Sequence, residues 1–351
     1  MKMRDKTFDI AKAIAIMLVI LGHSIATSEY KILVNLVFLA NLSVFFVSSG
    51  YFYRPNKTMK QIVLRGINTL FVPYLIGTVV FFVLYTARHF RELNHVPDYL
   101  MAITVGNAAT NVTLPGNIHV AYSAGVFWFL PMMFVANIIF HLIMRLPNDV
   151  YRGAGVLVMT VLGMAIARIY FWPWTFQSAL QVQVYYFMGY LLSKHVRFIR
   201  QPVWWFVVLE LFLVAIVTKS GMYLLSAGIA PNIVLSTIGA AASALVLLQI
   251  SNRLSMSQHL RRTSKFLAYL GQISIMIFIV HAFDNGMIVS AVLRQLTSHL
   301  HQSSSLLLGM IAFAIIRFII DTTLAYLLVS TKITNKLFVD RDFPIRIGGR
   351  Q

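Results

Sequence analysis

Long apolar runs, separated by short polar segments, extend along almost the whole chain. A helix that crosses a bilayer needs about 20 largely apolar residues, and ten segments reach or approach that length. They cover residues 8–27, 32–53, 69–87, 122–144, 154–171, 179–192, 203–217, 229–250, 266–292 and 305–330. No alternation of the kind typical of strands competes with this pattern. The sequence therefore predicts an all-α fold, a polytopic membrane helical bundle of about ten transmembrane helices.

Composition agrees with a chain that is built for lipid. Of its 351 residues, 58% are hydrophobic and only 11% are charged, and the mean hydropathy is +0.76. Soluble domains carry about 25% charged residues, so this chain lacks the polar surface that a water-soluble globule of this size needs. There is no cysteine, which excludes disulfides, thiol catalysis and thiolate ligands, and we expect no metal. We expect one integral membrane domain over residues 1–351 with no appended soluble domain.

The net charge of +18 is explained by where the cations lie. Most of the 29 Lys and Arg residues fall in alternate connections, those on the cytoplasmic side if the N-terminus is cytoplasmic. This distribution predicts that both termini lie in the cytoplasm, and it leaves no need for a nucleic-acid partner. The longest connection, residues 88–121, then lies outside, and Pro97, Pro115 and Gly116 predict no regular element there.

Three chemically active side chains lie in the first apolar segment. Lys12 and His23 are eleven residues apart, so both project from nearly the same helix face, roughly 16 Å apart along the axis. A charge in a spanning helix costs on the order of 2.5–3.5 kcal/mol and rarely persists without a use. Asp9, one turn from Lys12, can pair with it, and an ordinary interfacial ion pair would explain these two alone. Because imidazole is the commonest general base, the aligned Lys12 and His23 favour a reaction channel.

Small and basic residues follow at the cytoplasmic end of the second segment. Ser48 and Ser49 lie at about the depth of Lys12, and small residues of this kind also let helices approach closely. The cations Arg54, Lys57, Lys60 and Arg65 come next. Most of this charge is an ordinary topology signal, but a polyphosphate donor would find its natural dock there.

Further candidates lie toward the outer ends of later segments. His281 is expected at a depth similar to that of His23, and Asp284, one turn on, could orient either imidazole; purely structural roles are the alternative. Trp128 is explained most simply as part of the aromatic belt at the membrane interface, and stacking against a sugar is the alternative. Arg317 and Asp321 have the i, i+4 spacing of a structural ion pair.

Five motifs in order resemble acyltransferase family 3, a family of integral membrane O-acyltransferases. Lys12 and His23, with ten residues between them, resemble its Arg/Lys-x10-His signature. Residues 45–52 are similar to its Phe-Phe-x-x-Ser-Gly-Phe segment, and residues 65–75 to its Arg-x-x-Arg followed by Pro-Tyr. Residues 127–131 resemble the Trp-Phe-Leu segment of its fucose 4-O-acetylase-like branch, and residues 270–281 its Leu-Gly-x-x-Ser…His span. Two departures are Asn68, in place of the second arginine, and residues 40–43, where many relatives carry His-x-Pro.

The resemblance implies an O-acetyltransferase of the bacterial inner membrane. It implies that acetyl-CoA comes from the cytoplasm and that the acceptor is a hydroxyl of an envelope glycan or lipid-linked sugar. The donor would be held by Arg65, Arg54, Lys60, Ser48 and Ser49. His23 would act as general base beside Lys12 and Asp9, either directly or through an acetyl-imidazole. His281, Asp284 and Trp128 would serve the acceptor.

A transporter or flippase is the alternative, because buried charges also suit an ion or substrate path. The chain shows neither an inverted repeat nor matching Gly/Pro-broken spans, which are common marks of such proteins.

Overall fold

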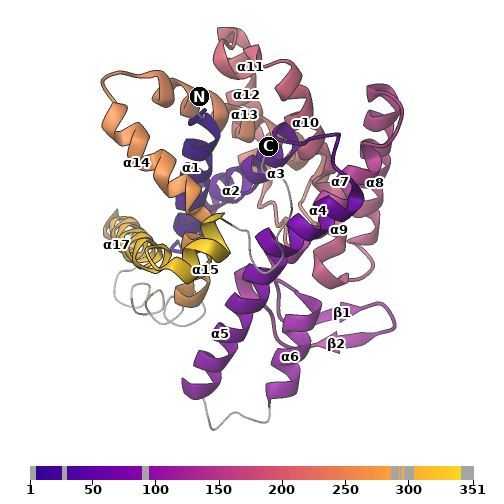
Figure 1. The fold of residues 1–351 in the computed structure, drawn as a ribbon, viewed down its shortest axis with the longest axis vertical. Coiled ribbons are helices and arrows are strands. Elements are labelled where there is room, and N and C mark those ends of the chain that lie inside the picture. The colour runs from indigo at the N-terminus through magenta and orange to yellow at the C-terminus, as the bar shows by residue number, and fades with distance from the viewer. Residues whose placement is uncertain are drawn as a thin grey trace. The chain divides into compact units, whose positions relative to one another are not determined.

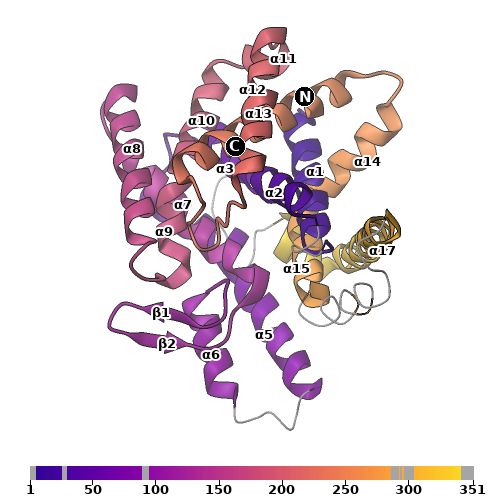
Figure 2. The same ribbon diagram turned by 180° about the vertical axis from the view of Figure 1, so that it is seen from behind.

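The computed structural model describes residues 5–25, 30–88, 95–285, 292, 295 and 304–340, and nearly all of its regular structure is helical. The chain divides into two compact units, each described by itself: residues 1–52, 188–223 and 230–330 form unit 1, and residues 53–187, 224–229 and 331–351 form unit 2. Figures 1 and 2 show the ribbon from two sides. The all-α prediction is therefore confirmed.

The helices of unit 1 are α1 (Thr7–Gly22), α2 (Lys31–Ala40), α3 (Ser43–Tyr51), α11 (Arg197–Arg200), α12 (Trp204–Ser220), α13 (Ile233–Met256), α14 (Arg261–Gln272), α15 (Ser274–Asp284) and α17 (Ser304–Val329). Unit 2 holds α4 (Met59–Gly66), η1 (Ile67–Phe71), α5 (Val72–Arg88), α6 (Val96–Val105), β1 (Val112–Leu114), β2 (Ile118–Val120), η3 (Gly125–Trp128), α7 (Phe129–Ile143), α8 (Asp149–Ile166), η4 (Pro173–Thr175), α9 (Phe176–Gln181), α18 (Lys332–Thr334) and η6 (Asn335–Asp340). Helix α10 (Gln183–Lys194) starts in unit 2 and ends in unit 1.

Membrane-spanning length is reached by fewer segments than the ten predicted. Among the described residues six helical segments are long and apolar enough to cross a bilayer: Lys31–Tyr51, Met59–Ala87, Gly125–Ile143, Asp149–Ile166, Ile233–Met256 and Leu306–Val329. A seventh is present if α14 and α15, bent by 69° at their junction, form one span. The other predicted segments contain shorter helices: α1 has 16 residues, α12 has 17, and Val182 separates α9 from α10. The chain is a multi-pass membrane protein.

Helix α1 is the centre of unit 1. It packs against α2, α3, α13, α14, α15 and α17, and Figure 1 shows it (indigo) beside α14 (orange). Ile10, Ile16 and Ile20 are almost completely buried. At Gly271 of α14 a Cβ atom would lie 1.8 Å from the carbonyl oxygen of Asp9, so only glycine permits this approach. The close packing fixes the helix whose end carries His23.

The connection of residues 88–121 is more regular than expected, and the prediction of no element there is wrong. Helix α6 contains Pro97 in its first turn, where the missing N–H breaks no helical bond. Strands β1 and β2 then pair antiparallel, with Val112 opposite Val120, beside α6 (Figure 2). Gly116 adopts a φ of 81° between the two strands, a conformation that glycine reaches without strain. The turn residues thus shape a hairpin instead of excluding one.

Candidate active site

His23 directly follows the end of α1. Its backbone N–H still bonds to the carbonyl of Val19 at 3.1 Å, while its own φ and ψ of −83° and 0° lead the chain out of the helix. The imidazole is half-buried, and its centroid lies 5.8 Å from the ring of Phe38 and 5.5 Å from that of His281. Among the described residues neither of its ring nitrogens has a hydrogen-bond partner. A partly accessible imidazole with free nitrogens can exchange a proton with a bound molecule.

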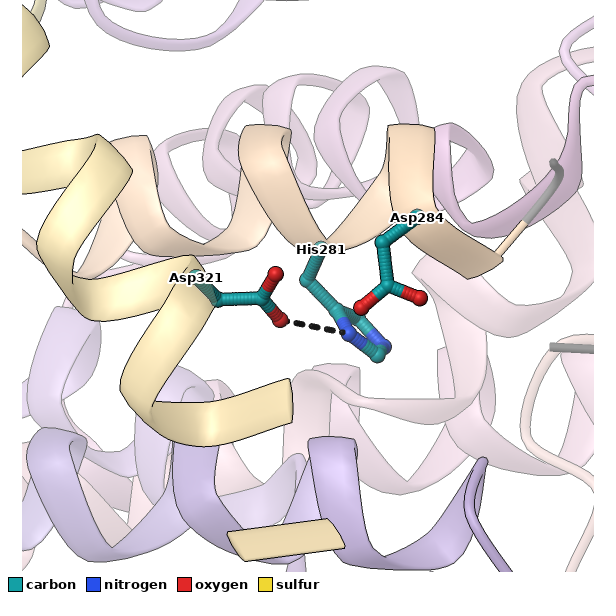
Figure 3. Close-up of side chains that lie close together, drawn as sticks. All are labelled: His281, Asp284 and Asp321. Carbon is teal, nitrogen blue, oxygen red and sulfur yellow. Dashed lines mark hydrogen bonds and ion pairs between the residues drawn. The ribbon is translucent and has the colours of Figure 1, made fainter. Parts of the chain in front are cut away.

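His281, on α15, lies next to this ring and is fully buried. Its Nδ1 lies 3.3 Å from Oδ2 of Asp321 on α17, the contact drawn as a dashed line in Figure 3. Nη2 of Arg317 lies 3.2 Å from the same Nδ1. Nε2 of His281 is buried and has no hydrogen-bond partner in the part of the chain that the structure describes. The ring is therefore held at one nitrogen and free at the other.

Arg317 connects three segments of unit 1. Its Nε donates to both carboxylate oxygens of Asp284, at 3.0 and 2.9 Å, and its Nη2 lies 2.8 Å from Oδ1 of Asp284. Its Nη1 donates to the hydroxyl of Ser24 at 2.7 Å, and that hydroxyl donates to the carbonyl of Ile20, also at 2.7 Å. The guanidinium thus links the end of α1 to α15 and α17.

Two expected pairings are wrong in this cluster. Arg317 and Asp321, one turn apart on α17, form no ion pair with each other; the arginine binds Asp284 and the aspartate faces His281. Asp284, expected to orient an imidazole, has its oxygens on the guanidinium instead. Both side chains of α17 have their partners on α15, because the packing of the two helices places Asp284 against Arg317 and His281 against Asp321.

A metal ion would have to compete with Arg317 for this place. Ligand atoms of His281, Asp284 and Asp321 lie within 4.8 Å of one another, and Figure 3 shows the three side chains converging. The guanidinium, however, already takes both oxygens of Asp284 and reaches Nδ1 of His281, which are the electron pairs that a metal would need. The guanidinium of Arg317 thus occupies the place that a metal cation would take in this cluster.

The remaining predicted residues of unit 1 lie on α1 and α3. Asp9 is buried and Lys12 half-buried on α1, and their pairing stays a prediction. Ser48 and Ser49 donate their hydroxyl protons to the carbonyls of Val44 and Phe45, at 2.7 and 2.9 Å. These protons are engaged within α3, so only the lone pairs of the two serines remain for a ligand.

Unit 2 carries the predicted donor cations. Arg54, Lys60 and Arg65 are exposed, and Lys57 is half-buried between them. Burial, reinforced by the positive charges of Arg65 and Arg54, holds the pKa of Lys57 below its ordinary value.

The sequence analysis did not single out Arg145, which joins this group. Its Nη2 donates to the carbonyl of Lys57 and lies 3.2 Å from Nε2 of the buried His141. The hydroxyl of Tyr53 lies 2.9 Å from Nδ1 of the same histidine. We call Arg54, Lys57, Arg65 and Arg145 the basic cluster. None of them has a carboxylate partner within the described parts of the chain.

Trp128 also belongs to unit 2, where it ends η3. It is only 8% exposed and meets Phe129 edge to face, with ring centroids 6.0 Å apart. A role of Trp128 in binding the acceptor stays a prediction.

Comparison with known proteins identifies the family. A family model described as an acyltransferase domain, that of acyltransferase family 3, matches residues 5–329, which include His23, the Arg317 network and the basic cluster. Comparison with curated proteins and with solved structures gave no match. The match covers almost the whole chain, and it agrees with the order of motifs in the sequence. The chain is therefore a multi-pass membrane protein that belongs to acyltransferase family 3.

Proposed function

We propose that this protein is an O-acetyltransferase of a bacterial inner membrane. In this proposal acetyl-CoA enters from the cytoplasm, and the acetyl group passes to a hydroxyl of an envelope glycan or of its lipid-linked precursor. The membership of acyltransferase family 3 supports acyl transfer in a membrane. The resemblance of residues 127–131 to the fucose 4-O-acetylase-like branch favours a sugar as acceptor.

The observation that carries the proposal is the state of His23. The imidazole is partly accessible, has no hydrogen-bond partner among the described residues, and lies next to a buried cluster of charged groups. A general base must reach the proton that it abstracts, and an accessible imidazole with a free nitrogen can do so. An imidazole kept for packing would instead be buried and hydrogen-bonded.

In the proposed reaction the acetyl group passes from the thioester directly to the acceptor hydroxyl. His23 takes the proton of the acceptor hydroxyl while that oxygen attacks the thioester carbonyl carbon. A carbon–oxygen bond forms, the carbon–sulfur bond breaks, and the proton on His23 passes to the departing thiolate of CoA. Lys12, on α1, would steady the donor or its sulfur.

The basic cluster supports a polyphosphate donor. Cations without carboxylate partners keep their donors free for an anion, and arginine offers phosphate two parallel hydrogen bonds. Arg54, Arg65 and Lys60 would hold the nucleotide end of acetyl-CoA. Lys57 and Arg145 extend this set beyond what the sequence motif indicates.

The test is acetyl transfer in membrane vesicles that contain the purified protein, radiolabelled acetyl-CoA and the envelope glycan fraction. We expect label in the glycan with the natural protein and a loss of about 10²- to 10⁴-fold with His23→Ala, the range for removal of a general base. The matched control is His259→Ala, which removes an exposed histidine of the same unit and should leave transfer unchanged.

Melting temperatures of both variants in detergent distinguish lost chemistry from lost folding. Transfer that persists in a folded His23→Ala protein would overturn the mechanism. Label that crosses the vesicle membrane without entering glycan would instead indicate a transporter.

A further inference from the structure

Nδ1 of His281 lies between two groups, one of which can only donate a hydrogen bond and the other, when ionised, can only accept one. Arg317 Nη2, at 3.2 Å, can only donate a hydrogen bond, so toward it Nδ1 has to accept. An ionised Asp321, whose Oδ2 is 3.3 Å away, can only accept, so toward it Nδ1 has to donate. One nitrogen cannot do both. The conflict determines where hydrogen lies on this ring.

The charge balance of the cluster requires one additional proton. Arg317 neutralises Asp284, with which it makes a two-oxygen contact. That leaves Asp321 as a fully buried carboxylate with no second Lys or Arg beside it among the described residues. An uncompensated buried charge is costly, so the cluster holds one more proton. Both oxygens of Asp284 already accept from Arg317, so this proton is held by Asp321 or by the imidazole of His281.

Both locations of that proton place a hydrogen on Nε2. If Asp321 holds it, Nδ1 accepts from Asp321 or Arg317, and the ring's own hydrogen is on Nε2. If His281 holds it, both ring nitrogens carry hydrogen, and Nδ1 donates to Asp321. The third arrangement, with hydrogen on Nδ1 only, leaves Asp321 uncompensated and turns an N–H toward the N–H of Arg317.

We propose that His281 is a catalytic hydrogen-bond donor, whose Nε2–H stabilises the negative oxygen that develops on the acyl carbonyl, and that Arg317 and Asp321 are its positioning residues. This inference rests on the proposed acyl transfer with His23 as base. Nε2 of His281 is buried and unpartnered among the described residues, and the two rings lie 5.5 Å apart, close enough for one tetrahedral centre to reach both.

The assignment gives the two histidines different tasks. His23 has free nitrogens and some exposure, which suit an acceptor of the hydroxyl proton. His281 is enclosed and held at Nδ1, which suits a donor that does not reorient during the reaction. Donors preorganised at the site of developing charge are among the largest single contributions to enzymatic rates, and they act most strongly where water is excluded.

A first experiment measures directly whether Nε2 of His281 carries a hydrogen. Nitrogen-15 solid-state NMR of histidine-labelled protein in lipid, compared with the same sample of His281→Gln, identifies the His281 signals among the ten histidines. A protonated Nε2 supports the proposal, and a bare Nε2 overturns it. This readout needs no turnover, so it stands even if acetyl transfer to glycan fails.

A second experiment uses the shapes of two amide side chains. The amide of glutamine reaches the position of Nε2, whereas that of asparagine reaches only the position of Nδ1. We expect His281→Gln to retain kcat within about 10-fold and His281→Asn to lose about 10²- to 10³-fold in kcat, with KM changed far less. Equal kcat losses in the two folded variants would overturn the proposal.

The pH profile separates a donor from a base. In His281→Gln the acidic limb of kcat/KM should persist, because it belongs to His23. The substitution retains Arg317, Asp284 and Asp321, the charged groups around His281. Disappearance of that limb would identify His281 as the base and overturn the assignment. Melting temperatures confirm that both variants fold.

Discussion

Each unit of the molecule contains a fully buried histidine in contact with an arginine, and the two pairs differ in what surrounds them. In unit 1 His281 and Arg317 share their contacts with two aspartates. In unit 2 His141 and Arg145 are joined by a tyrosine and a backbone carbonyl, with no carboxylate among the described neighbours. The first cation is neutralised inside the protein, whereas the second is exposed and has no carboxylate beside it among the described residues.

The contrast extends to the histidines themselves. Because arginine only donates, Nε2 of His141 accepts from Arg145, and its Nδ1–H therefore donates to the hydroxyl of Tyr53. Both nitrogens of His141 are thus satisfied, and the ring serves to hold Arg145. His281 has one nitrogen free, which is the arrangement expected of a group that meets a reacting molecule. A satisfied imidazole supports structure, and an unsatisfied one is available for chemistry.

The largest effect should come from removing the neutralised cation. Arg317→Met leaves the half-buried Asp284 without its partner and should lower the free energy of unfolding by about 3–5 kcal/mol. Denaturation in SDS followed by tryptophan fluorescence measures it. The control Arg253→Met removes an exposed arginine of the same unit and should change little. Asp284→Asn added to Arg317→Met should recover part of the loss, and no recovery would show that the pair is not the cause.

Arg145→Ala should mainly weaken ligand binding, and it should also lower the free energy of unfolding by about 1–3 kcal/mol, because the buried Nε2 of His141 loses its donor. A hydrogen bond to a charged group contributes about 1.5–3 kcal/mol, so the dissociation constant for acetyl-CoA should rise about 10- to 100-fold. Isothermal titration measures it. The control is Arg152→Ala in the same unit, whose guanidinium already pairs with Asp149 at 2.9 Å. Equal effects of the two substitutions would contradict the distinction between neutralised and open cations.

Tyr53→Phe tests the connection behind Arg145. The substitution removes the acceptor of the Nδ1–H of His141 and should lower the free energy of unfolding by about 1–3 kcal/mol, since a buried donor is left unpaired. Tyr151→Phe, at a 59% exposed tyrosine of the same unit, should have no effect. A comparable loss in both variants would indicate that the hydroxyl of Tyr53 does not hold the histidine.

The smallest effect is a pH dependence of donor binding. Because the pKa of Lys57 is lowered by burial and by Arg65 and Arg54, this lysine loses its charge at a lower pH than an ordinary lysine. Acetyl-CoA affinity should therefore fall a few-fold as pH rises through that lowered pKa and be recovered as pH falls, as expected when one of several cations is lost. Lys57→Arg should make acetyl-CoA affinity less dependent on pH. An unchanged pH dependence in this variant would show that Lys57 is not its source.

The sequence predicts the helical class, because apolar length is a local signal. The spacing of Lys12 and His23 is also a local signal, and the reactive role that it indicates stays a prediction. It does not predict the partners of His281. Asp321 lies 40 residues away and approaches only when α15 packs on α17, and the i, i+4 spacing of Arg317 and Asp321 indicated a local pair instead. Arg145 was missed for the same reason, since its link to Lys57 spans 88 residues. Contacts between distant segments depend on packing, which no spacing rule records.

The hydrogen bond from Arg317 to Ser24 has a consequence for biosynthesis. It joins residues 293 positions apart, next to His23, the proposed general base. During synthesis α1 is made before α17, so Ser24 has no Arg317 to bind until the residues between them are translated. Contacts of such high sequence separation form slowly and late. A nascent or truncated chain that lacks α17 therefore holds His23 without the contact between Arg317 and Ser24, and in the proposed mechanism acyl transfer has to wait for α17.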